Sequence, residues 1–378
     1  MRPATLPRAA AEHRVLVVDA ERGAGETTSA LELPALLRAG DLVVLNDAAT
    51  LPASLEGRTA GGEAIELRLV GALSGPAESV RFKVALLGRG DHRTRTEDRP
   101  PPPKVAIGET LRLGDELVAV VLGVATFSAR LVDVELRAVE GDGADATWAA
   151  LYRRGRPVQY AHVPRVLALW DVQNAWTGRP WAVEMPSAGR ALRIATLVAL
   201  RRRGVEVAFV THAAGLSSTG DAEIDARLPL AERFEVGEAV VRAVLRAKAR
   251  GGRVLAVGTS VVRALESAAR LSGEGPLRAA SGVTELLLGP TTTRMIVDGL
   301  LTGVHEPETT HFALLGAFAE RAVLDAALVT TEREGLLGHE LGDAWLVWGT
   351  GATGVVAASD PRARCASSTC AASATVAA

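Results

Sequence analysis

The residues best suited to bind a ligand stand in the segment V-G-T-S-V-V-R-A-L-E at residues 257–266. An apolar run ends at Val257, Gly258 allows a sharp turn, and Thr259 and Ser260 offer hydroxyls at the start of an expected helix. A helix that begins at the carboxyl end of a strand presents free backbone N–H groups and a positive dipole end. In open α/β sheets, ligands bind at that edge. The alternative is an ordinary strand-to-helix turn with a hydroxyl cap.

Two further segments place polar groups after apolar runs. His212 comes two residues after the end of the expected strand Val205–Val210, where an imidazole can carry a proton or bind a base, or can serve structure alone. The loop His305–His311 holds two histidines six residues apart with Pro307 between them, so it lacks the H-E-x-x-H spacing of a zinc site. It is more typical of a loop that caps the following helix. The turn Met185–Gly189 would let a ligand approach the backbone closely, or merely reverse the chain.

Composition bounds the class of protein. The 378 residues are 48% hydrophobic and 23% charged, with a net charge of −2, which excludes a disordered chain and a globally basic nucleic-acid binder but not a local basic patch. The only cysteines, Cys365 and Cys370, fall in a Ser/Ala-rich tail, and we expect no metal site there. No apolar run is long enough to span a membrane, so we expect a cytoplasmic protein without membrane contact.

The spacing of apolar residues predicts two kinds of structure. Short alternating runs with Gly-rich turns between Ala53 and Val139 favour a small β-barrel or sandwich. Strands and helices alternate after Ala150, which favours an α/β sheet that the strand Asp41–Leu45 also joins. The expected elements there are strands at 205–210, 254–257, 295–297 and 345–348 and helices at 192–203, 239–250, 262–269 and within 307–319.

We therefore predict a mostly parallel sheet with helices on both faces, interrupted by an inserted small β-barrel domain. The α/β domain would comprise residues 1–54 and 151–357, the barrel residues 55–150, and a disordered tail residues 358–378.

The order of the motifs indicates a family. The chain reads G-D-L-V-V-L-N-D at 40–47, P-S-A-G at 186–189, G-V-E-V-A-F-V-T-H at 204–212, V-G-T-S-V-V-R-A-L-E at 257–266 and V-D-G-L-L-T-G-V-H-E-P-E-T-T at 297–310. This series resembles the S-adenosylmethionine:tRNA ribosyltransferase-isomerase family of queuosine biosynthesis, whose fold is an α/β domain interrupted by a β-barrel. The resemblance extends from Gly40 to about Phe318, with Gly342-Asp343-Ala344 matching a late G-D-A of the family.

The resemblance implies a reaction. The family transfers the ribosyl moiety of S-adenosylmethionine to the aminomethyl group of a 7-deazaguanine in the tRNA anticodon, rebuilds the sugar as an epoxycyclopentane, giving epoxyqueuosine, and releases adenine and methionine. S-adenosylmethionine is thus a co-substrate, and no metal is needed to make its sulfonium a leaving group. A base must remove a proton, and adenine must be protonated or hydrogen-bonded as it departs.

The resemblance also implies site residues. His212 is the first candidate for proton transfer and His305 the second, with Glu266 or Asp47 as an alternative base. We expect S-adenosylmethionine where residues 257–266 meet residues 186–189 and His212. Its expected contacts are Asn46, Pro186, Ser187, Ala188, Gly189, Gly258, Thr259, Ser260, Arg263 and Thr310.

Several positions depart from the family pattern. Family arginines fall on Ala49 and Ser54, histidines on Ala191, Arg227 and Leu230, and an asparagine on Gly303. Arginine and histidine suit phosphate binding and proton transfer, so the departures leave three readings open. The chain is an active enzyme on the tRNA anticodon region, a diverged paralogue that uses a free 7-deazapurine or other small acceptor, or a non-catalytic nucleotide- or tRNA-binding relative. A monomer is favoured.

Overall fold

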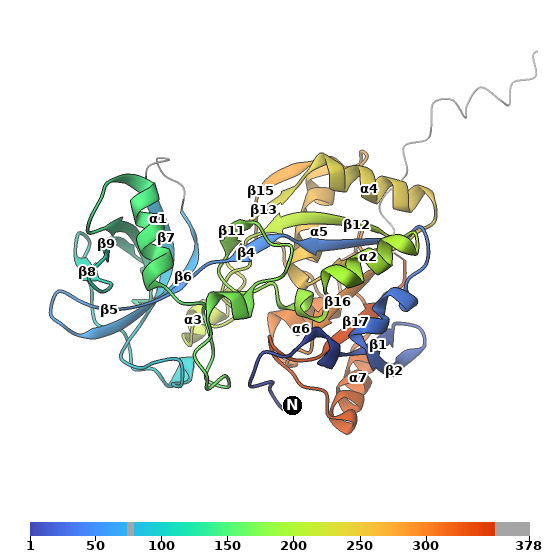
Figure 1. Ribbon diagram of the computed structural model, residues 1–378, viewed down its shortest axis with the longest axis horizontal. Coiled ribbons are helices and arrows are strands. Elements are labelled where there is room, and N and C mark those ends of the chain that lie inside the picture. Colours follow the sequence, from blue (N-terminus) through green and yellow to red (C-terminus); the bar gives the residue numbers. More distant parts are fainter. Residues whose placement is uncertain (74–78, 352–378) are drawn as a thin grey trace, which may run out of the picture.

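The computed structural model describes residues 1–73 and 79–351. Within this part of the chain, the strands form a nine-stranded sheet, a closed six-stranded barrel and a two-stranded sheet. Figure 1 shows the barrel at one side of the molecule and the large sheet with its helices at the other. Ser54 and Arg156 form an antiparallel bridge where the chain enters and leaves the barrel. The predicted tail, with Cys365 and Cys370, lies outside the described residues.

The large sheet is mixed, so the prediction of a mostly parallel sheet is wrong. Its strand order is β15-β13-β12-β3-β14-β16-β17-β1-β2. The pairs β12–β3, β3–β14, β14–β16 and β17–β1 are parallel, and the other pairs are antiparallel. A strand buried on both faces reads as a continuous apolar run in either direction, so the sequence pattern does not determine strand direction. The strands are β1 Arg14–Asp19, β2 Gly23–Ser29, β3 Leu42–Asn46, β12 Glu206–His212, β13 Glu232–Val236, β14 Val254–Val257, β15 Ala280–Thr284, β16 Gly299–Gly303 and β17 Ala344–Trp348.

Helices cover both faces of this sheet, as predicted. Side chains alternate along each central strand, so that Leu42 and Val44 of β3 enter one hydrophobic core and Val43 and Leu45 enter the other. The first core is closed by α4 (Glu238–Ala249), α5 (Thr259–Ser272), α6 (Thr310–Leu315) and α7 (Arg321–Glu334). The second is closed by α2 (Ile194–Arg202) and the 3-10 helices at 30–36 and 187–191. No helix of the described residues is long and apolar enough to cross a membrane.

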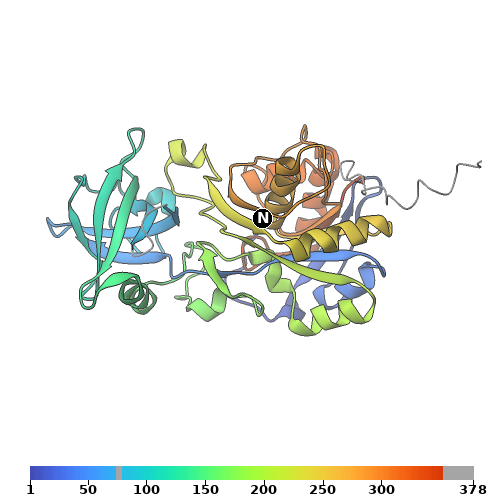
Figure 2. The ribbon, with the colours of Figure 1, turned by 90° about the horizontal axis from the view of Figure 1, so that it is seen from above.

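The predicted β-barrel is confirmed as a closed barrel with the strand order β10-β7-β6-β5-β8-β9. Its strands are β5 Ser54–Arg58, β6 Ala64–Ala72, β7 Val80–Leu87, β8 Thr110–Arg112, β9 Leu117–Val124 and β10 Leu131–Ala138. Helix α1 (Gly143–Arg154) packs against it, and Ala150 and Leu151 belong to its hydrophobic core. We therefore propose that the barrel unit ends after α1, a few residues beyond the sequence-based boundary. Figure 2, a view from above, also shows the barrel beside the sheet domain.

One predicted strand is absent. Residues 295–297 do not enter the sheet, because their backbone N–H groups donate to the carboxylate of Glu266 at 2.9–3.1 Å instead of to a neighbouring strand. The strand starts at Gly299. The helix expected from Pro307 begins at Thr310, where Thr309 caps it by accepting a hydrogen bond from the Phe312 N–H.

Candidate active site

A cavity of about 230 Å³ opens at the carboxyl ends of β14 and β16, between the sheet and the segments that return from the barrel. It is lined by the turn before α5, the 3-10 helix at 187–191, the start of α6 and the loops at 214–217, 286–288 and 339–340. Parallel strands bring loops far apart in sequence to one edge of a sheet, and ligands of α/β proteins bind there. Eight predicted residues line this cavity: Ser187, Ala188, Gly258, Thr259, Ser260, Arg263, His305 and Thr310.

The turn between β14 and α5 forms one wall. Gly258 has a φ of 97°, which favours glycine, and its N–H donates to the carbonyl of Leu301 on β16. A Cβ at this position would lie 3.6 Å from the Cβ of Ala188, an ordinary contact. The backbone conformation, rather than a lack of space, therefore requires glycine here. The first turn of α5 presents its free N–H groups to the cavity beside Ser187 and Ala188, where a negatively charged group is stabilised.

A buried ion pair forms the adjacent wall. Arg263 on α5 donates to the carboxylate of Glu232 at the start of β13, and both residues line the cavity. The Arg263 Nε also donates to the carbonyl of Leu286 at 3.0 Å, and Glu232 accepts the Gly215 N–H at 2.6 Å. Burial lowers the pKa of Arg263 to about 10, so the guanidinium stays charged at neutral pH. The pair holds strand β13, helix α5 and the loop at 215 in one arrangement.

His212 lies behind this pair rather than in the cavity. Its ring is fully buried, its Nε2 lies 3.5 Å from Glu232 Oε2, and neither ring nitrogen has a hydrogen-bond partner among the described residues. Burial and the Arg263 charge lower the pKa of His212 to about 3, so the ring is neutral at physiological pH. His212 therefore contacts a cavity residue without lining the cavity itself.

His305 and His311 lie in the cavity wall. Their rings stack with centroids 5.0 Å apart, and Thr302 Oγ1 lies 2.7 Å from Nε2 of His305. Burial and the neighbouring histidines lower the pKa of His305 well below its ordinary value, and burial lowers the pKa of His311 to about 4. Both rings are therefore neutral at physiological pH. The sequence identified His305 but passed over His311 as part of a capping loop.

Two other predicted residues, Asn46 and Asp47, organise the backbone beside the cavity. Asn46 Oδ1 accepts the His212 N–H at 3.0 Å and its Nδ2 donates to the His212 carbonyl at 2.8 Å, which ties the end of β3 to β12. Asn46 Nδ2 also lies 3.4 Å from Ser260 Oγ, its one link to the cavity wall. Asp47 accepts the Thr211 hydroxyl at 2.6 Å and does not line the cavity.

Pro186, Gly189 and Glu266 also lie outside the cavity lining. A Cβ at Gly189 would lie 2.7 Å from Asn174 Nδ2 and 2.9 Å from Trp176, so this glycine permits packing beneath the turn. Pro186 accepts a hydrogen bond from Asn174 at 2.9 Å. The carboxylate of Glu266 is completely buried and accepts the N–H groups of residues 295–297 together with the Arg270 guanidinium. It positions this segment and does not face a substrate.

A polar cluster that the sequence did not reveal stands on the barrel side of the cavity. The Tyr160 hydroxyl donates to Glu184, which also accepts the Ser217 hydroxyl at 2.8 Å, and all three line the cavity. Burial raises the pKa of Glu184, and burial together with the Glu184 charge raises the pKa of Tyr160 well above its ordinary value. The available signal was weak: Glu184 is a carboxylate two residues before the Pro186 turn.

Comparisons with known proteins find a family model, curated relatives and a solved structure similar to this chain. The family model described as "Queuosine biosynthesis protein" matches residues 2–347. An S-adenosylmethionine:tRNA ribosyltransferase-isomerase of Acidithiobacillus ferrooxidans is 35% identical over 354 residues, covering 91% of this chain and 93% of the relative. The protein of the same name from Sorangium cellulosum is 34% identical, covering 90% and 93%. A crystal structure of S-adenosylmethionine tRNA ribosyltransferase from Thermotoga maritima matches 91% of this chain and 95% of that one, with 23% identity and a TM-score of 0.48.

Proposed function

The chain belongs to the queuosine biosynthesis family of S-adenosylmethionine:tRNA ribosyltransferase-isomerases, and we propose that it catalyses the complete reaction implied by its sequence motifs. In this reaction, the ribosyl moiety of S-adenosylmethionine is transferred to a 7-aminomethyl-7-deazaguanine base of tRNA and isomerised. The products are epoxyqueuosine in the tRNA, adenine and methionine. We further propose a cytoplasmic location and a monomeric state.

The single observation that supports this proposal is that one cavity gathers residues from the matched motifs. The glycine turn at 258–260, the 187–188 turn, Arg263, His305 and Thr310 come from distant parts of the chain and line the same space. We propose that S-adenosylmethionine binds there. A carboxylate such as that of its methionyl part suits the free N–H groups and positive end of α5.

We propose His305, rather than His212, as the group that exchanges a proton with the substrate. A general acid or base must reach the proton that it transfers, either directly or through one water. His305 lines the cavity with a neutral imidazole, and Thr302 Oγ1 at 2.7 Å fixes its orientation. His212 does not line the cavity and contacts the Glu232–Arg263 pair, which does. We therefore assign His212 a structural role beside this ion pair.

Exposed arginines beside the cavity support a nucleic-acid acceptor. Arg233 lies over the ring of Trp181 at 3.7 Å, and Arg227 lies over Phe127 at 4.2 Å. Both arginines are exposed and flank the cavity-lining residues 228, 229 and 232. Guanidinium groups contact phosphates, and arginine and aromatic planes stack on unpaired bases such as those of an anticodon loop. The net charge of −2 is therefore compatible with a local surface for tRNA.

Two measurements test the proposal. The first is calorimetric titration of S-adenosylmethionine into wild type, Gly258→Trp and Gly258→Ala. The alanine variant carries the backbone strain of a positive φ but leaves the cavity open, whereas the indole fills it. We expect binding to be lost in the tryptophan variant and retained in the alanine variant. Equal affinity of these two variants would remove this cavity as the S-adenosylmethionine site.

The second measurement is release of adenine and methionine with two acceptors, a tRNA that carries 7-aminomethyl-7-deazaguanine and the free 7-deazapurine. We expect release with the tRNA and the appearance of epoxyqueuosine in its nucleoside digest. Release with the free base alone would assign a small-molecule acceptor and contradict the proposal. Absence of release with both acceptors, in protein that binds S-adenosylmethionine, would favour the non-catalytic reading.

A further inference from the structure

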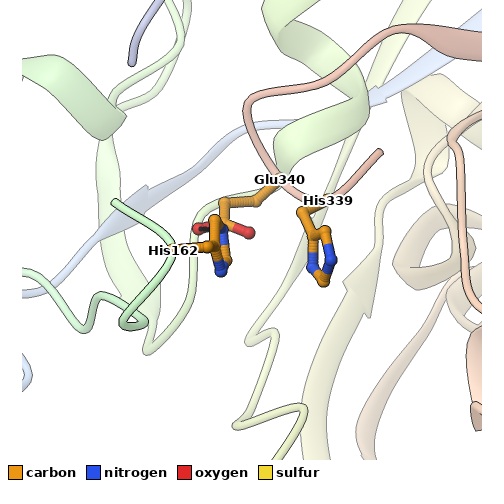
Figure 3. A group of neighbouring side chains, drawn as sticks. All are labelled: His162, His339 and Glu340. Atoms are coloured by element: carbon orange, nitrogen blue, oxygen red, sulfur yellow. Dashed lines mark hydrogen bonds and ion pairs between the residues drawn. The ribbon is translucent and has the colours of Figure 1, made fainter. Parts of the chain in front are cut away.

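Two histidines and a glutamate from distant parts of the chain meet at the rim of the cavity. One possible ligand atom from each of His162, His339 and Glu340 lies within 4.8 Å of the others. His162 Nε2 lies 3.1 Å from Glu340 Oε1, and the two imidazole rings are 4.4 Å apart between centroids. Figure 3 shows the side chain of His162 beside that of Glu340, with His339 next to them. The three residues are partly buried, and His339 and Glu340 line the cavity.

An ion pair alone does not account for this arrangement. The His162–Glu340 contact uses one imidazole and one carboxylate oxygen. The second imidazole, His339, stands against the first, and within the described residues neither of its ring nitrogens makes a hydrogen bond. Outside the group, His339 Nε2 lies 3.5 Å from Glu306 Oε1. A cation shared by both rings would account for the second imidazole.

The backbone at His339 adds a second observation. This histidine has a φ of 66°, and it is the one non-glycine residue with a positive φ among the residues that the structure describes. Hydrogen bonds of the His339 N–H to Val304 and of the Gly342 N–H to the His339 carbonyl hold the conformation. A strained backbone persists only where the surrounding structure fixes it, and such positions cluster at functional sites. Here the residue with this conformation has its imidazole beside His162.

We propose that His162, His339 and Glu340 bind a divalent transition-metal ion of the zinc class. Imidazole nitrogens with one carboxylate oxygen form the protein ligand set of many zinc and other first-row metal sites that keep a coordination position open. Because His339 and Glu340 line the cavity, an ion held by them would border the space in which a substrate carboxylate, a phosphate or water can bind. Glu306 is placed to be a further ligand or to orient the His339 ring from outside.

The proposed ion would link two parts of the fold. His162 lies in the segment that returns from the barrel, whereas His339 and Glu340 lie in the loop between α7 and β17 of the sheet domain. Metal binding would therefore fix the barrel side of the cavity relative to the sheet side. This site lies beyond the proposed transfer reaction, and the reaction itself needs no metal step.

The test uses full-length protein without an affinity tag, stripped with a chelator and then titrated with Zn²⁺ in competition with a chromophoric chelator. We expect one tight Zn²⁺ per chain in the wild type. His162→Ala and His339→Ala should each weaken binding by at least about 10- to 100-fold, because a lost ligand costs at least as much as a lost outer-sphere partner. His92→Ala removes a histidine from a barrel loop, where its Nε2 contacts the Pro164 carbonyl, and should leave the affinity unchanged.

Two readouts separate a built site from surface binding. Co²⁺ in place of Zn²⁺ should give the intense visible absorption of a low-coordinate site in the wild type, and this absorption should be absent in His339→Ala. Thermal unfolding of the metal-free variants checks that each one is folded. Equal Zn²⁺ affinity of the wild type and both ligand variants would overturn the proposal. These measurements use neither S-adenosylmethionine nor tRNA, so they stay decisive if the transferase assay fails.

Discussion

Replacement of His212 by phenylalanine would reveal the protonation state of a buried imidazole beside an ion pair. The ring of His212 faces Glu232 on β13 and Arg263 on α5, and its Nε2 lies 3.5 Å from a carboxylate oxygen. At that distance an imidazolium would form an ion pair with Glu232. However, the carboxylate is already occupied by Arg263, and burial together with the Arg263 charge lowers the pKa of His212 to about 3. The neutral ring is therefore the expected state.

The lowered pKa sets a measurable dependence of stability on pH. The unfolded chain takes up a proton at His212 near its ordinary pKa of 6.5, whereas the folded protein does so near 3. Between these values the unfolded state binds more protons, so the free energy of unfolding falls as the pH falls. One pKa unit corresponds to about 1.36 kcal/mol. His212 should thus remove about 2 kcal/mol of stability between about pH 7 and about pH 5.

Urea unfolding of the wild type and His212→Phe over this pH range tests the reasoning. Phenylalanine keeps a ring of similar shape and does not titrate, and its packing cost does not depend on pH. The stability of the wild type should fall by about 2 kcal/mol more than that of the variant. His311 is buried with a lowered pKa in both proteins, so its contribution cancels. If the wild type instead gains stability relative to the variant as the pH falls, His212 is protonated and paired with Glu232, and the reasoning fails.

Three further predictions concern catalysis, stability and RNA binding. His305→Gln should slow adenine release about 100- to 10,000-fold because an amide cannot accept the proton, whereas His212→Phe should slow it far less; a similar loss in both variants would contradict this assignment. In urea unfolding, Glu232→Leu should cost about 3–5 kcal/mol because its arginine partner stays buried and charged, against at most about 1 kcal/mol for Glu206→Leu in an exposed pair. Arg233→Ala should weaken tRNA binding. It should also reduce the slope of log binding constant against log salt concentration by about one, and an unchanged slope would exclude a phosphate contact.

The sequence predicted the strands and helices better than their arrangement. Alternation at 65–70, 80–86, 117–122 and 130–136 indicated four of the six barrel strands because each has one face in the barrel core, whereas the short strands β5 and β8 were not predicted. Strand direction in the large sheet was not predictable, since β17 and β14 have equally apolar sequences although one is antiparallel and the other parallel to β16. The apolar run at 295–297 suggested a strand, but only the fold shows that a carboxylate 29 residues earlier binds its N–H groups.

The site was predictable where a motif stands at a strand end, and not where the fold brings loops together. Gly258, Ser260 and Arg263 belong to one local pattern, and the structure places all three on the cavity wall. Tyr160 and Glu184 are 24 residues apart and carry no local signature, yet their side chains meet in the same wall. His212 shows the opposite error: it stands at the end of a core strand, but its fully buried side chain contacts the ion pair and does not line the cavity.

Two of the positions that depart from the family pattern, Ala191 and Gly303, differ in their surroundings. Ala191 belongs to the second hydrophobic core, so its replacement of a histidine changes packing beneath the 187–191 turn. Gly303 instead lines the cavity, and a Cβ there would lie 4.0 Å from Cε1 of His305. The glycine therefore leaves space beside the imidazole that we propose as the proton carrier. A family enzyme with asparagine at this place could hydrogen-bond the ring or substrate from the side, whereas here Thr302 is the one hydrogen-bond partner of that ring among the described residues. Here Thr302 orients the imidazole through a hydroxyl, and the rate of adenine release by Thr302→Val relative to wild type measures how much that orientation contributes.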